Sequence, residues 1–313
     1  MNILLILGSW SSEREVSLSS GAMIEKALVS LGHSVTRFDP ETSLSGLLDA
    51  AKKADFAFLA LHGAPGEDGL IQAMLDTVNC PYQGSGPAGS FLALNKAAAK
   101  ELFRQNGLLT PDWVLLPARP PKGWQPGFSY PLFIKSNTGG SSLGMERVAR
   151  PEDLEAALDR LFAKGGEFIV EPAVTGFEVT CGVLENTDGT VRALPPILIR
   201  PKTPIQDGGF FDYIAKYEPG AAEEICPAPI PDELTRKIQD IALAVHKTLG
   251  LRDYSRSDFI VTEHGEPMLL EVNTLPGMTA NSLLPKAAAV VGMPFEALIG
   301  HLVELGAEKK RNI

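Results

Sequence analysis

Four polar side chains near the C-terminal end of the sequence have the types and spacing of a metal site. Residues 255–273, SRSDFIVTEHGEPMLLEVN, are two alternating runs around a central His-Gly turn, which predicts a β-hairpin. Whether that turn is counted as two residues or four, Asp258 is expected to pair with Glu271, and Arg256 with Asn273. All four side chains would then project from one face, because side chains alternate along a strand.

This face would bring two carboxylates together. Directly opposed Cβ atoms lie about 5 Å apart, and carboxylates that close repel each other unless a positive charge separates them. Oxygens of Asp, Glu and Asn are the ligands that Mg²⁺ prefers. Asp258, Glu271 and Asn273 are therefore predicted to bind magnesium. For any one of these residues alone, the alternative is an exposed polar strand face beside Arg256.

A lysine and a glycine-rich loop form a candidate phosphate site. The apolar strand expected over 131–135 ends on Lys135 and enters the Gly/Ser loop at 139–144. Small residues leave backbone N–H groups available to an anion, and a lysine supplies a point charge. Lys96, on a helix expected over 88–105, is a second candidate. Taken alone, a glycine loop between strands is more often just a hairpin connection, and the alternative for Lys96 is a solvated helix lysine.

An interrupted strand could hold a purine. The segment EFIVEPAVTGFEV, 167–179, runs from a buried strand into a break at Pro172 and then into a new strand. A purine can pair with the open backbone groups of such a break, and Glu178 can accept both ribose hydroxyls. With the lysine, the glycine loop and the hairpin, the segment completes a nucleotide cleft. Glu178 is therefore the candidate nucleotide-binding residue of this segment.

The loop GSWSSEREVSLSSG, 8–21, follows the first apolar strand and looks like a phosphate-binding loop. Its first helical turn carries Glu13 and Glu15, however, and acids at a helix N-terminus repel phosphate. Ser12 and Glu15 have the spacing of a capping box, which gives Glu15 a structural role. Glu13 has no such role, and it is predicted to bind an ammonium group.

The elements that would position these groups form an α/β fold of three units. Residues 1–94 alternate short apolar runs with helical periods, which predicts a Rossmann-like domain with a parallel sheet. Residues 95–182 carry the glycine loop and the interrupted strand at 167–179. Residues 183–313 carry a long loop and the predicted metal hairpin. The strands expected in the first unit are 2–7, 34–38, 55–61 and 80–83, with helices at 12–31 and 68–78. The later strands are expected at 131–135, 144–149, 167–172, 177–185 and 191–199, with helices at 151–163 and 231–249 and a long loop at 201–228.

Composition excludes several classes of protein. The chain has 313 residues, of which 44% are hydrophobic, enough for two or three packed domains. Its 28 Lys and Arg against 38 Asp and Glu give a net charge of −10, opposite to that of a nucleic-acid reader. The three cysteines lie far apart, which fits a reducing cytoplasm rather than disulfides or zinc. The N-terminal apolar run is too short for a signal or a membrane span, so no membrane partner is expected.

Seven motifs, in order, resemble the ATP-grasp fold and, within it, the D-alanine-D-alanine ligases of bacterial cell-wall synthesis. They are SEREVSLSSG, LALHGAPGEDG, KSNTGGSSLGM, VEPAVTGFEVT, FFDYIAKY, SRSDF and LLEVNTLPGMTANSLLPKAA. The resemblance covers nearly the whole chain and implies a Rossmann-like domain followed by two ATP-grasp lobes. It also implies a homodimer and a two-step reaction. The carboxylate of one D-alanine attacks the ATP γ-phosphate, and the amine of a second D-alanine displaces phosphate from the acyl phosphate, leaving ADP.

The resemblance assigns roles around ATP. Backbone groups of Pro172 and Val174 would pair with adenine, and Glu171 and Glu178 belong to the same ATP-binding segment. Residues that would neutralise phosphate oxygens are Lys96, Lys135 and Lys216. Residues that would hold two magnesium ions, for which manganese can substitute, are Asp258, Glu271 and Asn273. The oxyanion hole for the tetrahedral intermediate would consist of Arg256 and the backbone N–H of Gly277.

It also assigns roles around the two amino acids. Glu13 would hold the ammonium of the first D-alanine, with His62 close by. Ser282 and Leu283 would bind the carboxylate of the second. Glu67, which reads first as an acid at a helix start, could support the site from behind. The family's hydrogen-bonded triad, which ties the closed site together, corresponds to Glu13, Ser141 and Tyr217.

The sequence departs from the family pattern at Ser9, Trp10, Phe211 and Ile214. None of these changes removes a catalytic group. Because Lys216 and Tyr217 are kept, the expected acceptor is D-alanine rather than D-lactate. The alternatives are another ATP-grasp carboxylate-amine ligase with a different acceptor and a non-catalytic nucleotide-binding homologue. A Rossmann dehydrogenase would need G-x-G-x-x-G, which the first loop lacks.

Overall fold

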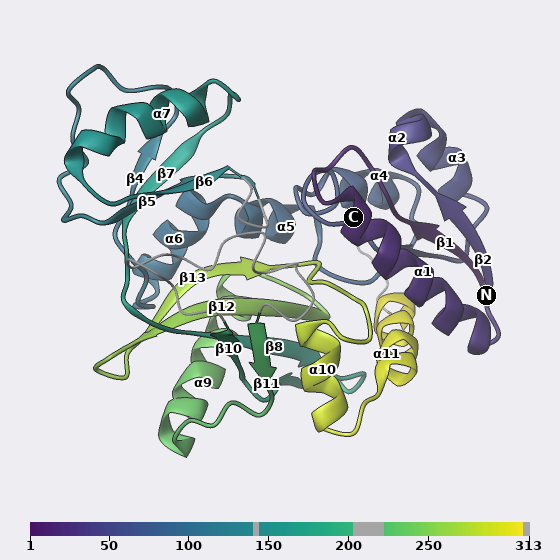
Figure 1. Cartoon of the computed structure of the whole chain (residues 1–313). Helices are drawn as coiled ribbons and strands as arrows, with labels where there is room; N and C mark the ends of the chain where they lie inside the picture. The colour runs from purple at the N-terminus through teal and green to yellow at the C-terminus, as the bar shows by residue number, and fades with distance from the viewer. Residues whose placement is uncertain (140–143, 203–221, 309–313) are drawn as a thin grey trace.

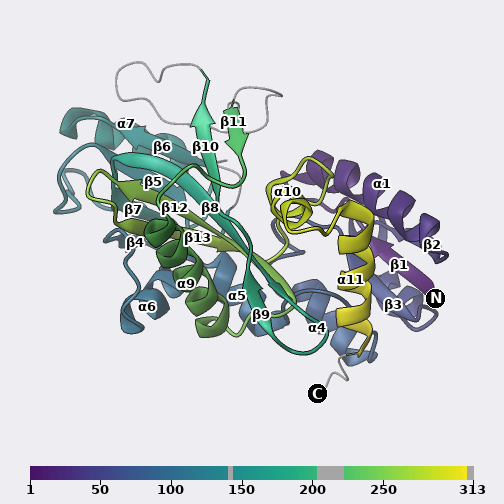
Figure 2. The ribbon, with the colours of Figure 1, turned by 90° about the horizontal axis from the view of Figure 1, so that it is seen from below.

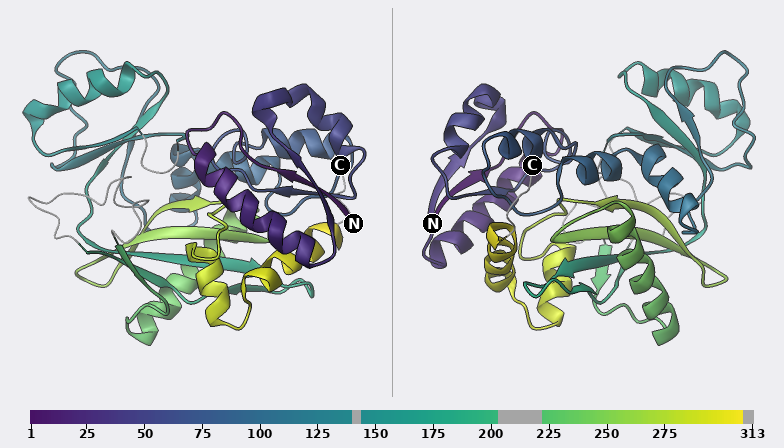
Figure 3. Two further views of the ribbon diagram at one scale, coloured as in Figure 1. Left: turned by 45° about the vertical axis from the view of Figure 1, so that its right-hand side comes forward. Right: turned by 180° about the vertical axis from the view of Figure 1, so that it is seen from behind.

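The computed structural model describes residues 1–139, 144–202 and 222–308 of the chain. Three β-sheets organise it, with three, four and six strands (Figure 1). The four-stranded sheet lies over one part of the six-stranded sheet, and the three-stranded sheet lies to the side of both (Figures 1 and 3). The segments that carry the predicted site therefore come from, or lie next to, three different sheets.

The three-stranded sheet is parallel, with the order β2-β1-β3, as predicted for the N-terminal unit. Its strands are β1 (Asn2–Ile6), β2 (Ser34–Phe38) and β3 (Phe56–Leu59). The helical segments that connect and follow them are α1 (Arg14–Ser30), α2 (Pro40–Ser43), η1 (Leu44–Gly46), α3 (Leu47–Ala51) and α4 (Leu70–Thr77). The strand predicted at 80–83 is reduced to one parallel bridge between Ala57 and Tyr82.

One hydrophobic core joins the beginning and the end of the described chain. Apolar side chains of β1 and β3 pack with those of α10 (Leu283–Val290) and α11 (Phe295–Glu308). Helix α11 lies beside α1 and β3 (Figure 2). Gly306 permits this approach, because a Cβ there would lie 2.7 Å from a ring carbon of Phe56 and 2.8 Å from the Tyr82 carbonyl oxygen.

The helix predicted over 88–105 is two helices, α5 (Pro87–Leu94) and α6 (Lys96–Gln105). Between them Asn95 has an extended backbone, and its side-chain oxygen accepts a hydrogen bond from the N–H three residues on, at 3.0 Å. Asparagine is a strong N-cap residue because it satisfies an N–H that has no helical partner. The break places Lys96 in the first turn of α6.

The four-stranded sheet is antiparallel, with the order β4-β7-β5-β6, and helix α7 covers it (Figure 1). Its elements are β4 (Val114–Leu116), β5 (Leu132–Ser136), β6 (Met145–Val148), η2 (Pro151–Asp153), α7 (Leu154–Phe162) and β7 (Phe168–Pro172). Leu154, Leu158 and Leu161 form one buried stripe along α7, at helical spacing. This sheet has a hydrophobic core of its own.

The six-stranded sheet has the order β11-β10-β8-β12-β13, with β9 also paired to β8. Its strands are β8 (Gly176–Glu185), β9 (Val191–Ala193), β10 (Ile197–Pro201), β11 (Ala222–Ile225), β12 (Tyr254–Thr262) and β13 (Pro267–Asn273), and α9 (Asp232–Thr248) packs against it. The strand predicted at 191–199 is divided because Pro195 and Pro196 lack the N–H groups that a ladder needs. Strand β11 lies inside the loop predicted at 201–228.

No single helix in the described part of the chain is long and apolar enough to cross a membrane. Helices α10 and α11 reach that length and composition only when they are counted together, across a bend of 100°.

Candidate functional site

Strands β12 and β13 pair Asp258 with Glu271 and Arg256 with Asn273, which confirms the predicted register at this end of the hairpin. Paired residues project to the same side of a sheet, and residues two apart along a strand share a face. The predicted polar face is therefore present, at the end of the hairpin away from its turn.

At the turn end the predicted register is wrong by one residue, because Phe259 pairs with Leu269. The turn spans 263–265, and the Thr262 N–H donates to the Glu266 carbonyl across its base at 3.0 Å. A bulge at Leu270 takes up the difference, so that the pairing is again as predicted at the next residue. The site end of the hairpin thus depends on an irregularity that no alternating pattern indicates.

Asp258 is 5% exposed and accepts hydrogen bonds from three side chains. Arg256 donates from Nε to Oδ1 at 2.9 Å and from Nη2 to Oδ2 at 2.8 Å. Thr180 Oγ1 donates to Oδ1 at 2.6 Å, and Asn273 Nδ2 donates to Oδ2 at 3.1 Å. Sequence reasoning missed Thr180, because only the pairing of β8 with β12 brings it beside Asp258.

The donor set fits a hard divalent cation. Asp258, Glu271 and Asn273 offer carboxylate and amide oxygens on one face. Within 1–139, 144–202 and 222–308 no group of three or more His, Cys, Asp or Glu is placed to hold a metal, so the asparagine would have to serve as the third ligand. Positive charge already lies beside both acids, Arg256 at Asp258 and Lys96 at 3.3 Å from Glu271 Oε2. An ion at this place would share Asp258 with the guanidinium group.

Lys96 connects the first turn of α6 to two other parts of the predicted site. Its Nζ donates to the carbonyl oxygen of Gly139 at 2.6 Å and pairs with Glu271 across the hairpin. The backbone N–H of Lys96 donates to the Asn137 carbonyl at 2.9 Å, which fixes the start of the helix. The side chain is only 10% exposed, so the alternative of a solvated helix lysine is wrong.

Glu171, at the end of β7, is 2% exposed and lies between two lysines. Nζ of Lys135 is 2.6 Å from its Oε2, and Nζ of Lys100 is 2.8 Å from its Oε1. Burial raises the pKa of Glu171, but the two ammonium groups outweigh burial and hold the pKa below its ordinary value. Burial likewise lowers the pKa of Lys100, and Glu171 opposes that shift.

Lys100 was missed by the sequence reasoning, although a signal was present. On a helix, positions three and four apart share a face. The buried residues of α6 are Lys96, Ala99, Lys100 and Phe103. A lysine on such a stripe has to find a partner, and the carboxylate of Glu171 is that partner.

The interrupted strand predicted near Pro172 is present. Residues 173–175 lie between β7 and β8 and belong to neither strand, although the N–H of Ala173 donates to the Pro131 carbonyl at 2.9 Å. Pro172 and Val174 are partly buried there, and Glu178 is partly buried on β8.

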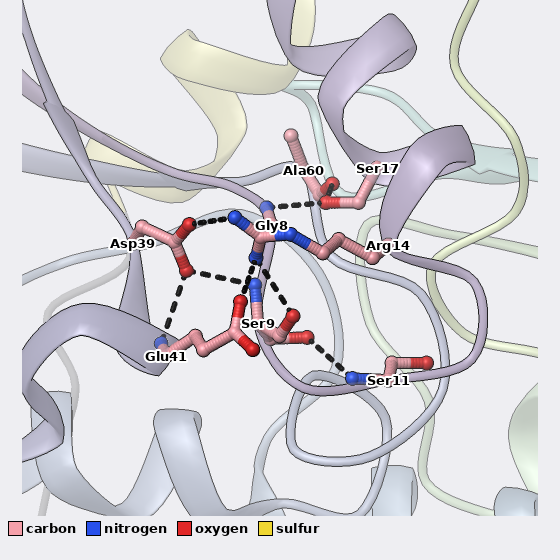
Figure 4. A network of polar contacts seen from close by, with 8 residues as sticks. All are labelled: Gly8, Ser9, Ser11, Arg14, Ser17, Asp39, Glu41 and Ala60. Atoms are coloured by element: carbon pink, nitrogen blue, oxygen red, sulfur yellow. Dashed lines mark hydrogen bonds and ion pairs between the residues drawn. The ribbon is translucent and has the colours of Figure 1, made fainter.

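The first loop begins with two residues in the left-handed region, Gly8 at φ 84° and Ser9 at φ 75°. Ser9 is buried, its N–H donates to Asp39 at 2.9 Å, and Arg14 donates to the Ser9 carbonyl at 2.8 Å (Figure 4). Arg14 also pairs with Asp39 at 2.6 Å. This network holds a serine at a position that favours glycine. Nothing in the structure explains Trp10, which is 49% exposed.

The predicted capping box of Ser12 and Glu15 is absent. Helix α1 begins one residue after Glu13, which is its N-cap residue. Ser11 Oγ accepts a hydrogen bond from the Glu13 N–H at 3.1 Å, while Ser12 and Glu15 are exposed. The loop therefore turns into the helix later than the spacing predicted.

Glu13 lies beside Gly63, the residue that follows His62. Glu13 is 8% exposed, and a Cβ on Gly63 would lie 3.0 Å from its Oε2. His62 is 5% exposed, with Nδ1 2.9 Å from the Leu275 carbonyl oxygen and Nε2 3.3 Å from Ser20 Oγ. Burial lowers the pKa of His62, which favours a neutral imidazole.

Glu67 fastens this turn to the segment after β13. Its Oε2 accepts from the N–H of Gly63 at 3.0 Å. Its Oε1 accepts from the N–H groups of Thr274 at 3.1 Å and Leu275 at 2.9 Å. A carboxylate that accepts three backbone hydrogen bonds sets the distance between the two segments, so Glu67 is more than an acid at a helix start.

Ser282 is the N-cap residue of α10, which begins at Leu283. Its Oγ accepts a hydrogen bond from the Thr279 N–H at 3.0 Å. A Cβ on Gly277 would lie 3.1 Å from the same Oγ, so the backbone of that glycine lies beside the start of the helix. Backbone N–H groups at a helix N-terminus attract carboxylates.

Several predicted residues lie outside the described part of the chain. They are Ser141, Lys216 and Tyr217, together with the family departures Phe211 and Ile214.

Comparisons with known proteins point in one direction. Residues 102–304 match the family model described as "D-ala D-ala ligase C-terminus", and residues 39–85 match "D-ala D-ala ligase N-terminus". The chain is 62% identical to a D-alanine-D-alanine ligase of Nitratidesulfovibrio vulgaris, over 98% of each chain. It is 63% identical to one of Oleidesulfovibrio alaskensis, over 98% of this chain and 96% of the relative.

Solved structures agree with these relatives. The D-alanine-D-alanine ligase of Bacillus anthracis in complex with ATP matches with a TM-score of 0.82 at 31% identity, covering 99% of this chain and 98% of that one. The ligase of Coxiella burnetii matches with a TM-score of 0.80 at 26% identity, covering 99% and 94%. The predicted ATP-grasp architecture is thereby confirmed, and this chain belongs to the D-alanine-D-alanine ligase family.

Proposed function

We propose that this protein is an ATP-dependent ligase that joins two D-alanine molecules, supplying the dipeptide for peptidoglycan precursors. Relatives at more than 60% identity carry that name over nearly their whole length, and a related structure holds ATP. The observation that carries the proposal is the position of Lys96. One buried ammonium contacts both the glycine loop at Gly139 and the hairpin at Glu271, so the phosphate side and the metal side of one cleft meet there.

The phosphate end of the reaction is assigned to three lysines. Lys96, Lys135 and Lys216 would neutralise phosphate oxygens, and the segment of Glu171, Pro172, Val174 and Glu178 would hold adenosine. Asp258, Glu271 and Asn273 would hold magnesium, or manganese in its place. Bound there, the metal would neutralise charge on the phosphate oxygens during transfer.

Arg256 and the N–H of Gly277 are assigned to the oxyanion hole. Arg256 is fixed by two hydrogen bonds to Asp258, so its charge is oriented before substrate arrives. Positive charge that is already in place where negative charge develops lowers the barrier, because nothing has to reorganise during the reaction.

The amino-acid end is assigned to Glu13 and His62 for the first D-alanine and to Ser282 and Leu283 for the carboxylate of the second. Glu13 is an almost buried acid beside Gly63, and burial lowers the pKa of His62, the residue before that glycine. An acid and a neutral imidazole suit an ammonium ligand. The triad of Glu13, Ser141 and Tyr217 would form only in the closed site, where it would exclude water from the acyl phosphate.

The larger organisation is part of the proposal. We divide the chain into units at 1–94, 95–182 and 183–313, and we expect a cytoplasmic homodimer. Because one hydrophobic core contains segments of the first and third units, we expect those two units to move together.

An amino-acid panel tests the function directly. The purified protein is given ATP, magnesium and one candidate amino acid at a time, and ADP, phosphate and dipeptide are measured. D-Alanine should give stoichiometric dipeptide, ADP and phosphate. D-Lactate offered together with D-alanine should give little depsipeptide. Turnover with L-amino acids, or none with D-alanine, would refute the substrate assignment.

A further inference from the structure

Lys100 is a fully buried lysine that none of the assigned roles uses. Its side chain is 0% exposed, one helical turn after Lys96 on α6. Its Nζ is 2.8 Å from Glu171, 2.6 Å from Thr110 Oγ1 and 3.0 Å from the Pro111 carbonyl oxygen. An ammonium has three donors, and burying one is costly unless all of them are satisfied. Here three oxygen atoms, one on each of these residues, lie within 3.0 Å of Nζ.

The charges around Glu171 leave a surplus. Two ammonium groups, of Lys100 and Lys135, flank one carboxylate, so the cluster carries one net positive charge. Lys135 is 17% exposed and Lys100 is 0% exposed, so only Lys135 can reach a ligand that enters from outside. Because Lys100 already balances the charge of Glu171, the charge of Lys135 is available to an anion.

We propose that Lys100 is a positioning residue for nucleotide phosphate binding, because it balances Glu171 and so leaves the charge of Lys135 to the phosphates. Without Lys100, the pair of Glu171 and Lys135 is neutral, and each phosphate contact of Lys135 has to compete with the carboxylate at 2.6 Å. This inference rests on the proposed nucleotide cleft and adds to it a residue that lies behind the ligand.

A purely architectural role is the rival explanation. Thr110, which Lys100 contacts, also donates to the Leu269 carbonyl at 2.8 Å, and the Leu269 N–H donates to the Leu109 carbonyl at 2.9 Å. Lys100 therefore also helps to attach the segment before β4 to the hairpin. An architectural role predicts that its loss weakens every ligand equally, whereas charge balance predicts a loss confined to ligands that carry phosphate.

The test compares ATP with adenosine on the full chain. Dissociation constants are measured by displacement of a fluorescent ATP analogue from the wild type and from Lys100→Met. Charge balance predicts that the affinity for ATP falls about 10- to 100-fold, the range for one hydrogen bond to a charged group, while the affinity for adenosine changes less than about threefold. Equal losses for the two ligands, or no loss for ATP, would overturn the proposal.

Arg104→Met is the matched control. Arg104 is on the same helix, and both cations lie over the Trp113 ring, with Lys100 Nζ at 5.6 Å and the guanidinium carbon at 4.9 Å. Arg104, however, is exposed and pairs only with Glu101 of its own helix among the described ion pairs. Its ratio of ATP to adenosine affinity should stay within about twofold of the wild type, because an exposed pair contributes little.

The double variant Lys100→Met with Glu171→Gln is the decisive arm. It restores one net positive charge, so the ATP-to-adenosine ratio should return to within about threefold of the wild type. A ratio that stays at least tenfold low contradicts action through Glu171. The double variant also keeps the test valid if Lys100→Met does not fold, because removing both buried charges costs less than stranding one. Failure of the wild type to bind ATP would instead refute the proposed function.

Discussion

Two buried carboxylates of the proposed site, Asp258 and Glu171, are neutralised in different ways. Asp258 accepts hydrogen bonds from neighbours in its own sheet, and two of these donors, Thr180 and Asn273, are neutral. Glu171 lies between two lysines, of which Lys100 comes from a helix outside its sheet. Among the described ion pairs, Asp258 therefore has one cationic partner, Arg256, whereas Glu171 has two. The carboxylate between lysines leaves positive charge to offer to an anion.

This difference explains how one cleft can receive magnesium and phosphate side by side. At Asp258 the carboxylate balances the charge of Arg256, so no surplus of positive charge from the described ion pairs opposes a cation there. Ammonium groups in excess reverse the sign of the surroundings. Each prediction below changes one of the two carboxylates or one of its donors, beginning with the largest expected effect.

Replacing Asp258 by Asn should have the largest effect. The variant loses a proposed magnesium ligand and the anchor of Arg256, so we expect kcat to fall about 1,000-fold or more. Binding of adenosine should be unchanged, because Glu171 is untouched. Single-turnover assays with ATP and D-alanine measure the loss. Activity within tenfold of the wild type would mean that the two carboxylates do not divide their tasks as described.

Replacing Glu171 by Gln should mainly reduce stability. Two lysines would be left without their buried carboxylate, which costs about 3–5 kcal/mol of unfolding free energy. The pKa of Glu171 is lower in the folded chain than its ordinary value, so its contribution is complete above that ordinary value and disappears as the pH falls through the folded one.

Urea unfolding at two pH values checks the sign of this effect. The difference in unfolding free energy between the wild type and Glu171→Gln should be large at about pH 7 and smaller at about pH 3. The lower pH lies below the ordinary pKa of a glutamate, so the unfolded chain takes up a proton more readily than the folded one. A difference in unfolding free energy that increases at about pH 3 would contradict the conclusion that Glu171 is ionised in the folded chain. Glu304→Gln, at an exposed position of α11, is the control and should show little change at either pH.

Replacing Thr180 by Val should have the smallest effect of the three. The change keeps the shape of the side chain but removes the 2.6 Å hydrogen bond to Asp258, which predicts a loss of about 1–3 kcal/mol in unfolding free energy. Thermal unfolding and the magnesium dependence of kcat measure it. We expect a higher magnesium requirement with the KM for ATP unchanged. A changed KM for ATP with an unchanged magnesium requirement would show that Thr180 does not act through Asp258.

Local patterns carry part of this arrangement. The alternation in β12 and β13 was enough to predict that Asp258 faces Glu271, because opposed positions in a hairpin are fixed by a short segment. The apolar runs likewise predicted the parallel N-terminal sheet. The resemblance of ordered motifs predicted the family, which the comparisons confirmed.

The rest depended on contacts between distant segments. Thr180 reaches Asp258 only because β8 pairs with β12. Lys100 reaches Glu171 only because α6, which packs against α9 and β13, brings it next to the end of β7. The predicted capping box was wrong because Ser11, rather than Ser12, accepts the hydrogen bond from the backbone N–H of Glu13 at the start of α1. The prediction of one long helix over 88–105 was wrong because Asn95 caps the second helix instead of continuing the first.

The shared core of β1, β3 and α11 also bears on how the protein is made. The apolar surface that α11 covers is synthesised first, and its cover is synthesised last of the described elements. At about 5–20 residues per second, a ribosome needs at least about ten seconds between β3 and α11. During that time the nascent N-terminal unit carries an uncovered apolar surface. Folding of this unit is therefore expected to finish only after α11 has left the ribosome, and chaperones that bind exposed apolar segments have their opportunity before then.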